Sequence, residues 1–259
     1  MVTYCLLYEQ GRVWTTPMND ELERAARVHY SFLPDHYEDD WLEVTTVLTP
    51  KGVLGGDYCS VIPLDGQRFA ACICDAAGHG LASALYAARI NTFVLTNILQ
   101  GHDPCELISA LNEFLCRRLT ESGMYASFFA VILDTGSMEM QFSGAGHPAA
   151  LHVSAADRQV YWLESQTTLV GFEHPLPVDC SMQASTIGPG DIILLYTDGL
   201  IEARNGNGTE FGKSGLTRYA NAHIHRDNDE FVSGLCSTVR DYCQGEMKDD
   251  LLCLGIQVK

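Results

Sequence analysis

The chain has 259 residues, 46% of them hydrophobic, which is enough to build one large core or two modest domains. Its formal net charge of −17 argues against nucleic acid and anionic membranes as partners. The ten cysteines include no Cys-x-x-Cys pair, which disfavours zinc ribbons and thioredoxin-type chemistry. The apolar runs are too short to cross a bilayer, and the first residues lack the basic region of a signal peptide, so we expect a cytoplasmic protein.

The first half of the chain predicts an N-terminal extension followed by alternating helices and strands. Residues 1–17 form the extension, and Asn19 or Asp20 is expected to cap a helix that Pro34 ends. The next expected elements are a strand over 41–48, a hairpin of strands 58–64 and 68–74, a long helix from Gly78 to about Gly101, and a helix over 103–119.

The second half of the chain contains mostly short strands. The expected elements are a hairpin of strands 127–134 and 138–143, short strands within 149–163 and 180–187, a strand over 191–196, helices over 212–222 and 229–242, and a buried strand over 251–258. Hairpins outnumber β-helix-β units, so the sheets should be mainly antiparallel, with helices packed outside them. The predicted fold class is α+β: a two-layer antiparallel β-sandwich flanked by helices, in the order helix, sheet, sheet, helix.

Four separated segments of the chain carry aspartates. They are Gly55-Gly56-Asp57, Asp75-Ala76-Ala77-Gly78-His79-Gly80, Thr197-Asp198-Gly199 and Asp249-Asp250. Three of these segments lie at the edge of an apolar, strand-like run, where a carboxylate is held rigidly. Carboxylates that converge on one sheet edge repel each other unless cations lie between them. Oxygen ligands without histidine or thiolate select Mg²⁺ or Mn²⁺, so the pattern predicts a cage for two such ions.

These four segments and one further motif resemble those of the metal-dependent protein phosphatases of the PP2C type. The further motif is Gly144-Ala145-Gly146-His147-Pro148, and the segment around Asp198 extends to Tyr196-Thr197-Asp198-Gly199-Leu200-Ile201-Glu202-Ala203. The resemblance covers roughly residues 20–259 and is to the bacterial branch of stress-response and sporulation phosphatases. One motif alone is a weak signal, but five in order are strong.

The resemblance implies a role for each aspartate. Asp75 corresponds to the carboxylate that bridges both metals, and the backbone carbonyl of Ala76 corresponds to a ligand beside it. Asp57 corresponds to the acidic residue that reaches one metal, mainly through water. Asp198 and Asp249 correspond to the remaining carboxylate ligands. The implied catalytic residues are Asp57, Asp75, Asp198 and Asp249, and the implied metal ligands are these four with Ala76.

Some assignments stay open. A one-residue shift in an extended segment would exchange Asp249 and Asp250, so either residue is a candidate ligand. Taken singly, the aspartate motifs are also compatible with ordinary turns or strand ends. His79 is a candidate general acid, although a structural role before the following helix is favoured, and His147 is expected to pack and form hydrogen bonds. A phosphate-binding arginine of the eukaryotic type is not evident, and Lys51 is a weak substitute.

The resemblance implies hydrolysis of phosphoserine or phosphothreonine by a water that two metal ions activate. The expected substrate is a small phosphoprotein, an anti-sigma-factor antagonist of the STAS-like type in a partner-switching pathway. Two alternatives remain: a catalytically weak pseudophosphatase that acts as a partner-binding scaffold, and a phosphoesterase for small molecules.

The expected domain organisation is an extension over 1–17, a regulatory or linker helix over 18–34 and a PP2C-like phosphatase domain over 35–259. The helix has an apolar stripe formed by Leu22, Ala25, Ala26 and His29. This stripe is available to pack on the core, on a second copy of the chain in a homodimer, or on a regulator. The regulatory hypothesis is that the helix sets the position of the segment that carries Asp57 and Asp75.

Overall fold

The computed structural model describes residues 17–259, apart from residues 35, 120–122 and 179. The extension expected over residues 1–17 lies outside the described residues, except for Pro17, with which α1 begins. The helices are α1 (Pro17–Tyr30), α2 (Leu81–Leu99), α3 (Pro104–Arg118), α4 (Asp198–Ile201), α5 (Gly212–His223) and α6 (Asn228–Tyr242). The strands are β1 (Tyr37–Glu38), β2 (Leu42–Thr49), β3 (Asp57–Asp65), β4 (Arg68–Ala76), β5 (Ala126–Asp134), β6 (Glu139–Ala145), β7 (Ala150–Val153), β8 (Val160–Leu163), β9 (Gln183–Thr186), β10 (Ile192–Tyr196) and β11 (Leu251–Val258).

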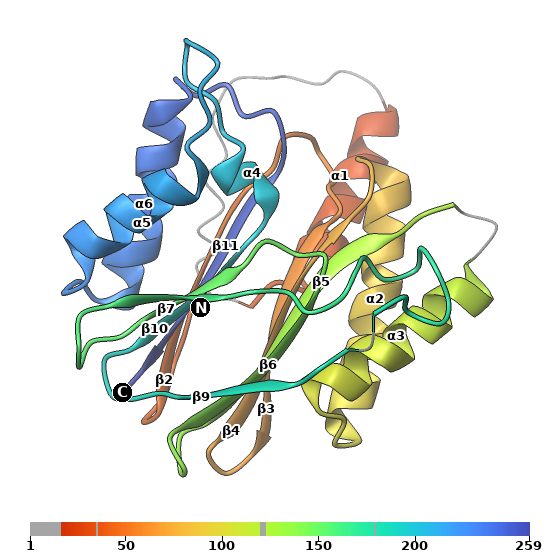
Figure 1. The fold of residues 1–259 in the computed structure, drawn as a ribbon. Helices are drawn as coiled ribbons and strands as arrows, with labels where there is room; N and C mark the ends of the chain where they lie inside the picture. Colours follow the sequence, from red (N-terminus) through yellow and green to blue (C-terminus); the bar gives the residue numbers. More distant parts are fainter. Residues whose placement is uncertain (1–16, 35, 120–122, 179) are drawn as a thin grey trace.

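The strands form two antiparallel sheets that stack face to face (Figure 1). Sheet A has the strand order β1-β2-β11-β10-β7-β8, and sheet B has the order β3-β4-β5-β6-β9. The hairpins expected from the sequence are present, because β3 pairs with β4 and β5 pairs with β6 in antiparallel register. The predicted α+β class with an antiparallel sandwich is therefore confirmed.

Apolar side chains fill three layers between the elements. The alternating residues of both sheets that point inward, such as Ile73 and Leu254, form the core between the sheets. Helices α2 and α3 cover the outer face of sheet B, with Ile90 and Leu111 buried against it. Helices α5 and α6 cover the outer face of sheet A, where Phe231 is buried. The result is the expected order of helix, sheet, sheet and helix (Figure 1).

The ends of the helices follow local sequence signals. The Asp103 carboxylate accepts hydrogen bonds from the backbone N–H groups of Cys105 and Glu106, each at 2.8 Å, at the start of α3. The Glu106 carboxylate accepts the Asp103 N–H at 3.0 Å, which completes a capping box. Helix α2 begins at Leu81, later than the expected start, because residues 78–80 form the bend that connects it to β4.

The apolar stripe of α1 packs on the phosphatase-like domain itself. Ala26 is only 2% exposed and forms a small cluster with Leu54 and Ala84, with Leu22 and Ala25 partly buried at its edge. Leu54 directly precedes the glycines that lead into β3. The helix therefore contacts the loop before β3, which is the contact that the regulatory hypothesis requires.

Several strands of both sheets begin or end at the same end of the sandwich. β3 begins there and β4 ends there in sheet B, while β10 ends there and β11 begins there in sheet A. The chain also passes from sheet B to sheet A near this end, through residues 146–149 between β6 and β7. All four aspartate segments are brought to this end. Within the described residues, every helix is too short or too polar to span a membrane.

Candidate metal centre

Asp57 and Asp75 face each other across two neighbouring strands of sheet B. Asp57 begins β3 and Asp75 lies one residue before the end of β4, and the two are partners in the antiparallel register. Asp57 is buried, with 5% of its surface exposed, and its Oδ2 atom has no hydrogen-bond partner in the structure. A buried carboxylate oxygen without a partner is unfavourable unless a proton or a cation binds it.

Asp198 reaches the same end of the sandwich from sheet A. It is the first residue of α4, a short helix where a simple turn was the alternative. Thr197 is tied to β11, because its N–H donates to the Leu252 carbonyl at 3.0 Å and its Oγ1 accepts the Leu252 N–H at 3.1 Å. A Cβ on Gly199 would lie 2.0 Å from the Asp250 carbonyl oxygen, so only glycine allows α4 to approach the start of β11 this closely.

The two acidic residues before β11 have different surroundings. Asp250 is buried, and its Oδ1 accepts the backbone N–H of Lys51 at 2.7 Å. A Cβ on Gly55 would lie 1.9 Å from the Asp250 Oδ2, so this carboxylate packs directly beneath the loop that leads to β3. Asp249 is exposed, and its charge raises the pKa of Asp198. The Asp250 carboxylate thus binds the loop before β3, whereas the Asp249 carboxylate is exposed to solvent and acts on the Asp198 carboxyl group.

Burial and mutual repulsion raise the pKa values of the carboxyl groups at this point. Burial, followed by the charge of Asp75, raises the pKa of Asp57 well above its ordinary value. Burial, followed by the charges of Asp198 and Asp249, raises the pKa of Asp75 to about 7. Burial and then Glu202 raise the pKa of Asp198 to about 6. A bound divalent cation would offset both the repulsion and the loss of hydration.

The donor atoms suit hard divalent cations. Within the described ranges, no group of three His, Cys, Asp or Glu side chains is already close enough together to coordinate a metal ion. The carboxylates are instead close neighbours whose repulsion a cation would relieve, and the unpartnered Asp57 Oδ2 is an available ligand atom. Ala76 is the last residue of β4, and because its side chain is a methyl group it has only a backbone carbonyl to contribute. The residues therefore fit Mg²⁺ or Mn²⁺.

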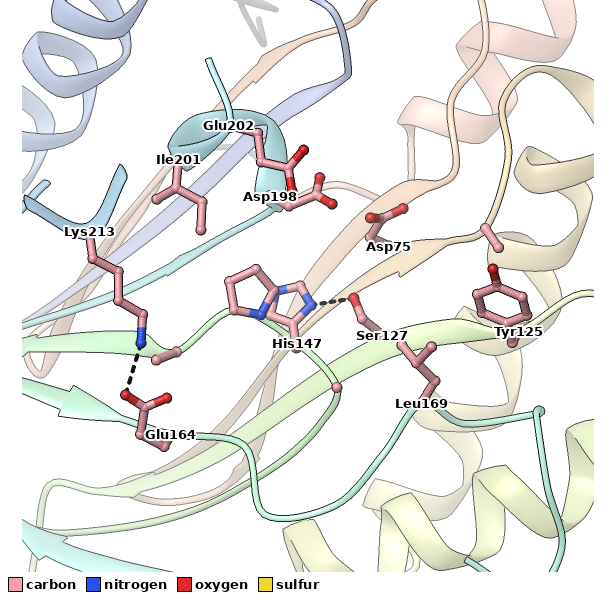
Figure 2. A pocket seen from close by; sticks show the side chains of 14 residues that line it. Asp75, Tyr125, Ser127, His147, Glu164, Leu169, Asp198, Ile201, Glu202 and Lys213 are labelled. Atoms are coloured by element: carbon pink, nitrogen blue, oxygen red, sulfur yellow. Dashed lines mark hydrogen bonds and ion pairs between the residues drawn. The ribbon is translucent and has the colours of Figure 1, made fainter. Parts of the chain in front are cut away.

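A cavity of about 470 Å³ opens beside Asp75 and Asp198, with walls from both sheets (Figure 2). Its walls are formed by Asp75, Ala77, Tyr125, Ser127, Gly146, His147, Pro148, Ala149, Glu164, Leu169, Asp198, Ile201, Glu202 and Lys213. Of the predicted site residues, Asp57, Ala76 and Asp249 lie outside these walls. The structure thus brings two of the predicted aspartates to the cavity and places the others next to them.

His79 lies away from the cavity. It is exposed, in the bend between β4 and α2, and does not belong to the cavity walls formed by the described residues. The helix that follows has Gly80 as its N-cap residue, without a side-chain cap. This position offers no contact that supports a general acid.

His147 and Ser127 form a buried hydrogen-bonded pair in the cavity wall (Figure 2). Ser127 Oγ lies 2.6 Å from His147 Nδ1, and His147 Nε2 lies 3.1 Å from the Tyr196 carbonyl oxygen. A serine beside a histidine has the atoms of a nucleophile and its base. Burial, however, lowers the pKa of His147 to about 3, which makes this imidazole a weak base for the serine proton. His147 packs and forms hydrogen bonds, as the sequence predicts.

Three charged residues of the cavity wall, Glu164, Glu202 and Lys213, have no role in the sequence prediction. Glu202 follows Asp198 by one helical turn, a spacing that could have indicated its effect on the Asp198 pKa. Lys213, in α5, is the only lysine or arginine that the described cavity wall contains. Its Nζ donates to Glu164 at 2.9 Å and lies 4.8 Å from the centre of the Trp162 ring. No local pattern connects Lys213 with the aspartates, because only the packing of α5 brings it to the cavity.

Comparison with known sequences identifies related phosphatases. Residues 65–259 match the family model described as stage II sporulation protein E (SpoIIE). The chain is 21% identical over 263 residues to the phosphoserine phosphatase RsbU of Bacillus subtilis (strain 168), which covers 100% of this chain and 77% of RsbU. It is 25% identical over 185 residues to the phosphoserine phosphatase RsbP of the same organism, which covers 70% of this chain but only 45% of RsbP.

Solved structures share the architecture. The SiaA-PP2C domain of Pseudomonas aeruginosa matches with a TM-score of 0.80 and 19% identity, over 93% of this chain and 97% of that domain. RsbX, solved in complex with magnesium, matches with a TM-score of 0.65 and 14% identity, over 87% of this chain and 99% of RsbX. The PP2C fold expected from the motifs is thus confirmed. Because the family model covers most of the sequence, this chain belongs to the SpoIIE family of PP2C-type phosphatases.

Proposed function

We propose that this protein is a metal-dependent phosphatase that hydrolyses phosphoserine or phosphothreonine in a small partner protein. The observation that carries this proposal is the meeting of Asp75 from sheet B with Asp198 from sheet A at one open cavity, with Asp57 opposite Asp75 on the next strand and the pKa values of all three raised. The relatives named as phosphoserine phosphatases support the substrate class.

We propose that Asp75 serves both metal ions. The charges of Asp198 and Asp249 act on it, and Asp57 faces it across the strand pair. We therefore assign Asp75 as the bridging ligand, with Asp57 on the side of sheet B and with Asp198 and Asp249 on the side of sheet A. The Ala76 carbonyl is the proposed backbone ligand. We assign Asp249 rather than its neighbour because the neighbouring carboxylate holds the loop before β3.

When bound, two divalent cations would lower the pKa of a shared water and neutralise charge on the phosphoryl oxygens. The chain's own part is to hold its carboxylates at fixed positions on strand ends and to present a cavity for the phosphorylated side chain. Ser127 is buried, and burial lowers the pKa of His147 beside it, so this pair is poorly suited to act as a nucleophile and its base. Attack by water, without a covalent enzyme intermediate, is therefore the mechanism that the side chains support.

The proposed partner is a phosphorylated anti-sigma-factor antagonist. The decisive experiment is Mn²⁺-dependent release of phosphate from such a protein, encoded beside this chain, compared with release from nucleotides and sugar phosphates. Release from the phosphoprotein alone supports the proposal. Release from small phosphoesters alone would favour the small-molecule phosphoesterase, and tight binding of the phosphoprotein without turnover would favour the pseudophosphatase scaffold.

Lys213 is expected to help bind the substrate. The other acidic or basic side chains of the cavity wall, apart from the histidine and the tyrosine, are carboxylates. The partner of Lys213, Glu164, is 63% exposed, so their ion pair is weak and a substrate phosphate can replace the glutamate. We expect Lys213→Ala to raise KM for the phosphoprotein by about tenfold, with little change in kcat, because a charge-assisted contact is lost. Steady-state kinetics at saturating Mn²⁺ test this expectation.

Lys259→Ala is the matched control for this prediction. Lys259 also pairs with a glutamate, Glu38, but lies at the opposite end of β11 from the cavity. An equal change in KM for both variants, or an unchanged KM in Lys213→Ala, would remove Lys213 from the substrate site.

Helix α1 is proposed to control the metal centre through Leu54. We expect Ala26→Glu to weaken Mn²⁺ binding by at least about fivefold, because a buried charge would lift the helix from the loop before β3. Calorimetric Mn²⁺ titration measures the effect, and Val28→Glu, at a position that is 63% exposed on the same helix, is the control. If folded Ala26→Glu keeps wild-type metal affinity, kinetics and oligomeric state, α1 is only a structural cover.

A further inference from the structure

The segment that carries His147 lies where the chain crosses from one sheet to the other. It follows β6 of sheet B and precedes β7 of sheet A. The His147 ring, which is 5% exposed, contacts both sheets, because Ser127 belongs to β5 of sheet B and Tyr196 ends β10 of sheet A. Figure 2 shows the ring pointing toward Ser127. One side chain therefore connects the two sheets at the end where the aspartates meet.

The two hydrogen bonds fix the ring in one tautomer. The Tyr196 carbonyl can only accept, so the His147 Nε2 atom carries the proton and donates to it at 3.1 Å. In the neutral imidazole the Nδ1 atom must then accept, and the Ser127 hydroxyl donates to it at 2.6 Å. The backbone of His147 is held as well, because Ser165 Oγ donates to its carbonyl at 2.8 Å and accepts its N–H at 3.2 Å. The ring has no freedom to turn without breaking these contacts.

Both partners of the ring adjoin proposed metal ligands. Ser127 is the register partner of Asp75 across β5 and β4. Tyr196 lies two residues before Asp198, at the end of β10. The two hydrogen bonds thus link the backbone that carries Asp75 to the backbone that carries Asp198. The distance between these carboxylates depends on how the ends of the two sheets are held together.

We propose that His147 is a positioning residue that sets the spacing between the sheet A and sheet B halves of the metal centre. It touches neither substrate nor metal in this role and acts through Ser127 and Tyr196. The inference rests on the proposed function, because it assumes that Asp75 and Asp198 bind the same pair of cations. Residues that orient metal ligands through hydrogen bonds typically change metal affinity by about 10–100-fold when they are replaced.

The experiment compares His147→Gln with His152→Gln. His152 is an equally buried histidine on β7, with its Nε2 2.8 Å from the Asp191 carboxylate, and it contacts the opposite end of β10. Both variants remove a buried, hydrogen-bonded ring, with two hydrogen bonds at His147 and one at His152. Mn²⁺ affinity is measured by calorimetry, and the melting temperature is measured in EDTA and in excess Mn²⁺.

We expect His147→Gln to weaken Mn²⁺ binding by at least about tenfold, while His152→Gln binds Mn²⁺ like the wild type, even if both lower the melting temperature in EDTA. Ser127→Ala removes one of the two hydrogen bonds without changing the ring, and it should weaken Mn²⁺ binding as well. It provides the measurement if His147→Gln does not fold. Unchanged Mn²⁺ affinity in the folded His147 or Ser127 variant, or an equal loss in the His152 control, would overturn the inference.

The outcome separates this inference from the proposed function. A wild-type protein that binds Mn²⁺ but releases no phosphate from any phosphoprotein contradicts the proposed function, while the Mn²⁺ affinities still decide the role of His147. A wild-type protein that binds no divalent cation contradicts both.

Discussion

Asp75→Asn is expected to reduce phosphatase activity by at least about a hundredfold, because it removes the carboxylate proposed to bind both cations. Asp75 lies at the cavity, opposite Asp57 on the adjacent strand and within reach of the charge of Asp198. Asparagine keeps the size of the side chain and removes only its charge. The loss should therefore appear in kcat, at saturating Mn²⁺, with the fold intact.

Asp65→Asn is the control for Asp75→Asn, because Asp65 ends β3 at the hairpin, at the other end of the strand that Asp57 begins. Its exposed pairing with Arg68 should contribute little to stability and nothing to activity. Asp57→Asn should resemble Asp75→Asn but recover part of its activity at high Mn²⁺, since it removes a ligand of only one ion. Near-wild-type turnover of folded Asp75→Asn with saturating Mn²⁺ would exclude a bridging role.

The second large effect concerns stability with and without metal. Cations that bind only the native state stabilise it by roughly 3 kcal/mol at a hundredfold excess over Kd. For a chain of this size, that corresponds to an increase of about 5–10 °C in the melting temperature. Removal of the cations with EDTA should reverse this increase, because the neighbouring carboxylates then repel each other again.

The stabilisation by metal should also grow with pH. The pKa of Asp75 is raised from 3.8 to about 7, and that of Asp198 from 3.8 to about 6. Between the unfolded pKa of 3.8 and the raised native pKa values, the native apo protein therefore binds more protons than the unfolded chain. The stability of the apo protein consequently falls as the pH rises from about 4 to 7. Cations compete with these protons, so the difference between melting in Mn²⁺ and in EDTA should widen over the same interval.

Melting curves at several pH values, recorded in EDTA and in millimolar Mn²⁺, measure both expectations. Because the same groups outside the metal centre titrate in both conditions, the difference between the curves isolates the centre. Curves that coincide at pH 8 would show that no cation binds between these carboxylates.

The sequence predicted most of the fold because its signals are local. The apolar runs around Asp65-Gly66 and Thr135-Gly136 indicated the two hairpins, and Asp103-Pro104 indicated the start of α3. Helix boundaries were less accurate where tertiary contacts decide them. Helix α1 begins at Pro17 and ends at Tyr30, ahead of both the expected cap and Pro34.

The candidate site was predictable where a motif carries its chemistry in adjacent residues. The opposition of Asp57 and Asp75 follows from a hairpin whose register the apolar pattern fixes. The different surroundings of Asp249 and Asp250 could not be predicted, because they depend on a loop almost two hundred positions away in the chain. The same holds for Lys213, which α5 brings to the cavity only after it packs on sheet A.

The position of the centre on the seam between the sheets has a consequence for folding kinetics. Its proposed ligands come from β3 and β4 in the first third of the chain and from α4 and the residues just before β11 in the last third. We expect contacts between such distant segments to form late in folding, because the entropy of closing a long loop is lost before they stabilise the chain. Cations bound there would raise the barrier to unfolding and leave the rate of folding almost unchanged. In a cell short of manganese or magnesium, the protein would still reach its native state, but each molecule would keep that state for a shorter time.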